Sequence, residues 1–194
     1  DGNLDLFYTD LSQLGYRLGS SSGVFGNFNL LATGNDTRGF VFIDYTDDSL
    51  DDIILGVNGN DRALNNNGDG TISNNAVGSS GVTINLDVAD INNDGFLDAA
   101  STVGQIYLNT GNSSPRFTFP TYNQQNVASA PTGYNPGDFH LADLDNDGDD
   151  DIVVANRGGQ NLIFETVSLI GTTYNYNLLR YNSGNGDSRR ISTS

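Results

Sequence analysis

Residues 143–152 read DLDNDGDDDI, and the rest of the chain is best understood outward from this stretch. Carboxylates occupy alternate positions in its first half, a glycine follows at Gly148, and a further carboxylate closes the motif at Asp151. Ca²⁺ takes about six to eight oxygens at roughly 2.3–2.6 Å, and a sharply turning chain can offer them from every second residue. Gly148 permits the turn because glycine adopts positive φ without a steric penalty. The predicted ligands are Asp143, Asp145, Asp147, Asp149 through its backbone carbonyl, and Asp151.

The same pattern recurs at three other places in the chain. Residues 90–98 read DINNDGFLD, an intact copy with an amide at its third position. Residues 44–52 read DYTDDSLDD, a degraded copy with serine in place of the glycine, and residues 1–5 read DGNLD, the second half of a fourth copy. The predicted ligands are Asp90, Asn92, Asp94, Phe96 and Asp98; Asp44, Thr46, Asp48, Leu50 and Asp52; and Asp1, Asn3 and Asp5. We therefore expect Ca²⁺ in the two intact loops, leave the degraded loop open, and regard the fourth site as partial.

The loops are not EF-hands, because an EF-hand closes with a glutamate at its twelfth position and the twelfth residue from Asp143 is Val154. They resemble instead the calcium loops of FG-GAP and VCBS-type repeats, which occur in the integrin α-subunit propeller and in many bacterial surface proteins. An NNGDG turn at residues 66–70 extends the resemblance beyond the loops. The resemblance implies a β-propeller with structural Ca²⁺ and a role in adhesion, ligand binding or surface assembly.

The spacing of the loops defines a repeat. Their closing aspartates are separated by 47, 46 and 53 residues, and periods of about 20–50 residues are typical of solenoids, propellers and arrays. Each unit holds about four short strand-like segments without helical periodicity, as propeller blades do. We predict an all-β, propeller-like array of about four four-stranded blades within one domain, residues 1–194. The approximate repeats are 1–39, 40–81, 82–138 and 139–194. A closed ring, part of a larger ring and an open array all remain compatible with this pattern.

The composition agrees with a metal-binding, extracellular protein. The net charge is −16, and 16 of the 24 acidic residues lie in the four loops, a clustering that a merely acidic surface does not need. The eight cations are scattered arginines, which argues against nucleic-acid binding. No run of about 18 apolar residues predicts a membrane span, and the absence of cysteine excludes thiolate metal sites. Calcium sites of this kind are typical of extracellular modules, so we expect a secreted or cell-surface protein.

Few residues are available for catalysis, because the chain has one histidine (His140), one glutamate (Glu165), and neither cysteine nor lysine. We therefore expect a non-enzymatic protein whose partners are other protein chains or glycans. The alternative is a lectin or a polysaccharide-active enzyme on the same scaffold. The aromatic residues are expected to form the core, with a sugar-binding surface as the alternative. We also expect the partial site at Asp1 to be empty in an isolated monomer, and the terminal strands to meet neighbouring subunits or the rest of a longer propeller.

Overall fold

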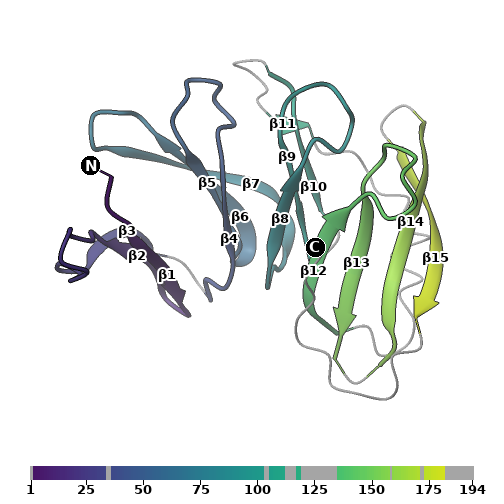
Figure 1. The fold of residues 1–194 in the computed structure, drawn as a ribbon, viewed down its shortest axis with the longest axis horizontal. Coiled ribbons are helices and arrows are strands. Elements are labelled where there is room, and N and C mark those ends of the chain that lie inside the picture. The colour runs from purple at the N-terminus through teal and green to yellow at the C-terminus, as the bar shows by residue number, and fades with distance from the viewer. Residues whose placement is uncertain are drawn as a thin grey trace.

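The computed structural model describes residues 2–33, 36–102, 105–111, 117–118, 135–157, 159–170 and 173–181. These residues form four antiparallel sheets, each of which pairs its strands in chain order (Figure 1). The predicted all-β class is confirmed. Within the described ranges there is no helix with the length and hydropathy of a membrane span.

The four sheets are drawn from successive stretches of the chain, and their bounds are as follows. The first sheet contains β1 (Leu6–Asp10), β2 (Gln13–Arg17) and β3 (Asn29–Thr33). The second contains β4 (Phe40–Ile43), β5 (Asp52–Leu55), β6 (Asn58–Asn66) and β7 (Ile72–Val82). The third contains β8 (Leu86–Ala89), β9 (Asp98–Ser101), β10 (Ile106–Asn109) and β11 (Phe117–Thr118). The fourth contains β12 (Pro136–Ala142), β13 (Asp151–Asn156), β14 (Asn161–Ile170) and β15 (Thr173–Tyr181).

The first sheet has three strands rather than the expected four. β1 follows the partial loop DGNLD as β5, β9 and β13 follow their own loops. The strands that enter the loops in the other sheets are β4, β8 and β12, and the described residues contain no equivalent of them in the first sheet.

Successive sheets pack face to face, with one apolar cluster between each pair. The cluster between the first and second sheets contains Leu14, Ala32, Ile53, Leu55, Val57 and Leu64. The cluster between the second and third sheets contains Ile43, Tyr45, Ile54, Ala63, Leu86, Ala99 and Tyr107. The cluster between the third and fourth sheets contains Ile91, Ala100, Ile106, Leu108, Phe139, Ile152, Val154, Leu162 and Phe164. The inner sheets are therefore buried on both faces, which explains why β5 is an uninterrupted apolar run after its aspartate.

The four sheets form a row. The first and fourth sheets lie at opposite ends of the molecule in Figure 1, and the described residues do not close into a ring. The loops between β4 and β5, β8 and β9, and β12 and β13 all lie at one edge of this row (Figure 1). This arrangement gathers the three acidic loops that the sequence singles out.

Candidate metal loops and an aromatic cleft

The three acidic loops share one backbone-to-carboxylate geometry. In the loop 143–151, the Asp143 carboxylate accepts hydrogen bonds from the N–H groups of Asp147 and Gly148, at 3.2 and 3.1 Å. Asp90 accepts the equivalent pair at 3.0 and 2.9 Å, and Asp44 accepts it at 3.2 and 2.8 Å. The first aspartate of each loop thus holds the turn in place, even in the degraded copy.

Positive φ angles occur at the same two positions of each loop. The sixth position has φ of 95° at Gly148, 91° at Gly95 and 67° at Ser49. Ser49 therefore adopts the left-handed conformation that glycine adopts freely, as the degraded sequence predicts. The fourth position is also left-handed, and Asn or Asp, which tolerate this conformation best among residues with a side chain, occupies it in every loop.

The loop 143–151 brings three carboxylates together. Oxygens of Asp143, Asp145 and Asp147 all lie within 4.8 Å of one another, and the three residues are exposed. Desolvation, with the negative charges of Asp147, Asp151 and Glu165 in addition, raises the pKa of Asp145. An all-oxygen donor set with mutually repelling charges fits a hard divalent cation such as Ca²⁺.

The other loops present weaker donor sets at the same positions. Asn92 and Thr46 replace the middle carboxylate of the loops 90–98 and 44–52. The three predicted carbonyl ligands, at Asp149, Phe96 and Leu50, each donate their N–H to the carboxylate two residues earlier, at 3.0, 3.0 and 2.9 Å. In the partial loop, Asn3 and Asp5 are described, whereas Asp1 lies outside the described residues.

The closing aspartates have a structural role that the sequence did not indicate. Asp52, Asp98 and Asp151 are buried, and each accepts a 2.8 Å hydrogen bond from a backbone N–H of the next strand. The donors are Asn66 on β6, Asn109 on β10 and Thr166 on β14. Asp5 is exposed but makes the same bond, at 2.9 Å, to the N–H of Gly19.

Their second oxygens also bind backbone in the two intact loops. Asp98 accepts from the N–H of Ile91 at 3.0 Å, and Asp151 accepts from the N–H of Leu144 at 3.1 Å. Each closing aspartate therefore ties its loop to the sheet, and its part in binding a cation stays a prediction.

Burial raises the pKa of the closing aspartates Asp98 and Asp52. Desolvation raises the pKa of Asp98 to about 7, although the hydrogen bond from Asn109 opposes the shift, and the charges of Asp94 and Asp90 raise it further. Desolvation also raises the pKa of Asp52. A cation at either loop favours the ionised carboxylate and is therefore coupled to proton release.

The two intact loops touch each other through Asn93. Its Nδ2 donates to the carbonyl oxygen of Gly148 and to Oδ1 of Asp149, both at 3.2 Å. Sequence reasoning gave Asn93 no role, because the contact joins segments 55 and 56 residues apart.

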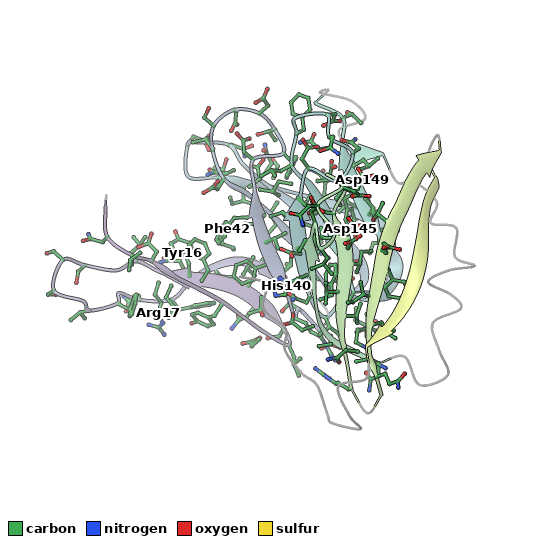
Figure 2. The ribbon with its side chains drawn as sticks, turned by 45° about the vertical axis from the view of Figure 1, so that its right-hand side comes forward. Tyr16, Arg17, Phe42, His140, Asp145 and Asp149 are labelled. Carbon is green, nitrogen blue, oxygen red and sulfur yellow. The ribbon has the colours of Figure 1, made fainter. Side chains whose placement is uncertain are left out.

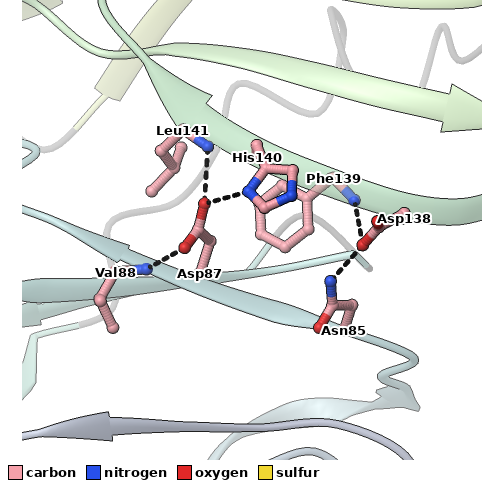
Figure 3. A network of polar contacts seen from close by, with 7 residues as sticks. All are labelled: Asn85, Asp87, Val88, Asp138, Phe139, His140 and Leu141. Carbon is pink, nitrogen blue, oxygen red and sulfur yellow. Dashed lines mark hydrogen bonds and ion pairs between the residues drawn. The ribbon is translucent and has the colours of Figure 1, made fainter. Parts of the chain in front are cut away.

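His140 belongs to a polar network between the third and fourth sheets (Figure 3). Its Nδ1 lies 3.1 Å from Oδ2 of Asp87 on β8, and the same oxygen accepts the N–H of Leu141 at 2.9 Å. Asn85 donates its side-chain amide to Asp138 in the same network. These contacts cross-link β8 and β12, which gives His140 a structural role.

A cleft of about 480 Å³ opens between the first and second sheets. Its aromatic wall is formed by Phe7, Tyr16 and Phe42; Tyr16 and Phe42 are labelled in Figure 2. The rings of Phe7 and Tyr16 stack at 5.3 Å, and Phe42 meets Phe7 edge-on at 5.0 Å. Phe42 is 41% exposed, an unusual exposure for a strand aromatic in a row of packed sheets. The cleft is lined by Asp5, Phe7, Tyr16, Leu31, Phe42, Asp51, Ile53, Leu64, Asn66, Gly70 and Ile72.

Comparison with known proteins finds similarity among solved structures but not in sequence families. No family model matches the sequence, and no curated protein matches it. Among solved structures, the chain is similar to an Agrocybe aegerita lectin that specifically recognises non-reducing terminal N-acetylglucosamine, with a TM-score of 0.52 and 18% sequence identity. The match covers 90% of this chain and 51% of the lectin, so the chain spans about half of the lectin's length. At this identity the similarity concerns the fold alone.

Proposed function

We propose that this chain is a non-enzymatic, extracellular carbohydrate-binding protein on a propeller-type scaffold of the FG-GAP and VCBS kind, with Ca²⁺ in its acidic loops. The aromatic cleft between the first and second sheets carries the proposal. The fold similarity to a lectin supports a carbohydrate ligand over a protein ligand, which is the other possibility that the repeat pattern raises.

The cleft has the chemistry that a sugar requires. Its volume falls within the range of about 300–1,000 Å³ that is usual for small-molecule sites. The faces of aromatic rings are electron-rich, and the C–H groups on one side of a pyranose pack against them favourably. Asp5, Asp51 and Asn66 lie in the same lining and supply acceptors and an amide donor for hydroxyl groups.

Two of the acidic loops contribute carboxylates to the cleft. Asp51 belongs to the loop 44–52, and Asp5 closes the partial loop, so both carboxylates of the lining come from acidic loops. An ion bound in either loop would lower the repulsion among its carboxylates, but the intact loops 90–98 and 143–151 offer Ca²⁺ the stronger donor sets. Mg²⁺ should substitute poorly, because it demands a tighter octahedral shell than these loops can offer.

Titration with N-acetylglucosamine oligomers, followed by a glycan array, tests the function. Phe42→Ala removes the exposed ring and should weaken binding at least tenfold. Phe25→Ala is the matched control, because Phe25 is 46% exposed but is not part of the cleft lining. Absence of glycan binding by the native protein, or equal losses in the two variants, would contradict the proposal.

The absence of catalysis needs its own measurement. Polysaccharides incubated with the calcium-loaded protein should show no new reducing or unsaturated ends. Appearance of such ends would favour the alternative of a polysaccharide-active enzyme.

A further inference from the structure

One positional rule governs how neighbouring sheets pack. Residues one and three positions after a closing aspartate face the preceding sheet, as Ile53 and Leu55 face the first sheet. The residue two positions after it faces the following sheet, as Ile54 faces the third sheet. The alternation follows from the period of two in a strand.

The rule holds in the fourth sheet as well. Ile152 and Val154 occupy positions one and three after Asp151, and both pack against the third sheet. Both are buried, with 7% and 1% of their surface exposed. The positions one and three residues after a closing aspartate are therefore the ones that pack against the preceding sheet.

In the first sheet the described residues cover the same positions only in part. Leu6 lies one position after Asp5 and is 43% exposed, and Tyr8 lies three positions after it. Leu30, on the same face through its pairing with Gly15 opposite Tyr8, is 54% exposed. Phe28 packs its ring 5.3 Å from that of Tyr8. The outer face of the first sheet therefore presents apolar side chains at Leu6, Tyr8, Phe28 and Leu30, and it has the residue pattern of a face that packs on a preceding sheet.

The fourth sheet ends the row with the complementary face. Val153 lies two positions after Asp151, where the rule places residues that pack on a following sheet, and it pairs with Ile163 on β14. Both are half-buried. The outer face of the first sheet thus presents positions that in other sheets pack on the preceding sheet. The outer face of the fourth sheet presents positions that in other sheets pack on the following sheet.

Residues of opposite charge lie near the loop ends of the two end faces, while Asp10 adds a carboxylate at the other end of the first sheet's outer face. Arg17 pairs with Leu6 in the first sheet and lies on its outer face. Glu165 follows Phe164, which pairs with Ile152, and shares a face of β14 with Ile163. Arg17 and Glu165 therefore each lie near the end of the sheet from which the acidic loops project. A head-to-tail contact between two copies would place this arginine and this carboxylate at the same end of the interface.

We propose that the outer face of the first sheet docks on the outer face of the fourth sheet of a second copy of this chain. The contact continues the packing that already joins the four sheets and pairs Arg17 of one copy with Glu165 of the other. Such a head-to-tail contact is heterologous and closes into a ring when its rotation permits.

Sedimentation equilibrium over a wide range of protein concentration tests the contact. The native chain should sediment as a multiple of 20.7 kDa, and Leu6→Asp should sediment as a 20.7 kDa monomer. Val82→Asp is the control, because Val82 is 40% exposed on the second sheet and should leave the assembly intact. Circular dichroism melting of each variant verifies that it is folded.

Charge reversal identifies the partner face. Arg17→Glu alone should lower the assembled fraction at least fivefold, and adding Glu165→Arg in the same chain should restore it. A native chain that stays at 20.7 kDa, a Leu6→Asp variant that still assembles, or a double variant that does not recover would each overturn the proposal.

Discussion

Changing Asp147 to Ala should destabilise the protein far more in calcium than changing Asp48 to Ala. The two aspartates occupy the fifth position of their loops, and each accepts one backbone N–H, from Asp149 at 3.0 Å and from Leu50 at 2.9 Å. Without metal the two substitutions remove equivalent hydrogen bonds, so their effects should be similar and small. Any difference in stability between the two variants in calcium therefore measures the stabilisation by the bound ion.

The size of that difference follows from mass action. An ion that binds only the folded state adds RT ln(1 + [L]/Kd), which is about 2.7 kcal/mol at a hundredfold excess over Kd. The loop of Asp147 has three mutually close carboxylates, whereas Thr46 takes the middle position in the loop of Asp48. We expect Asp147→Ala to lose about 2–3 kcal/mol of unfolding free energy that Asp48→Ala keeps. In a domain of this size the loss lowers Tm by roughly 5–10 °C.

The assay is urea and thermal unfolding, followed by circular dichroism, of the native chain and both variants in EDTA and in millimolar Ca²⁺. The native chain should also melt at a lower temperature in EDTA. Equal losses for the two variants in calcium, or a larger loss for Asp48→Ala, would refute the ranking of the sites. Unfolding that does not depend on calcium in the native chain would refute the metal loops altogether.

Three further outcomes follow from the structure. Ser49→Gly should stabilise the metal-free protein by up to about 1 kcal/mol because it relieves positive φ, and Gly148→Ala should destabilise it by about 1–2 kcal/mol; opposite signs in urea unfolding would contradict this. Asn93→Gly keeps positive φ but removes the donor to the loop 143–151, and calorimetric titration should show weaker calcium binding there, whereas Asp47→Gly at the matched position should leave it unchanged. Asp61 on β6 is buried and accepts hydrogen bonds from the N–H of Val57 and the hydroxyls of Thr83 and Tyr107. Burial raises its pKa, so its contribution to stability is greatest below the unfolded pKa of about 4 and is lost as pH rises through the folded pKa. Asp61→Asn should therefore gain stability relative to the native chain between acid and neutral pH, and a pH-independent difference would exclude this origin.

The local structure of the loops could be predicted from the sequence alone. A glycine or its substitute at the sixth position, and aspartate at the first, dictate the turn through backbone sterics and short-range hydrogen bonds. The period of the closing aspartates indicated the repeat, and the strands that follow Asp5, Asp52, Asp98 and Asp151 begin where the pattern expects. The loop conformations depend on neighbours within about ten residues, and the repeat is visible as a spacing along the chain, so both could be predicted from the sequence.

How the units meet depends on the tertiary structure. The burial of the closing aspartates, the Asn93 bridge and the contact of His140 with Asp87 all join residues that are distant in sequence. The aromatic cleft likewise combines Phe7 and Tyr16 of one sheet with Phe42 of the next, so composition could not separate it from the core. Alternation gives the two faces of a strand but not which face a neighbouring sheet covers, because that depends on sheet packing and on contacts between segments tens of residues apart.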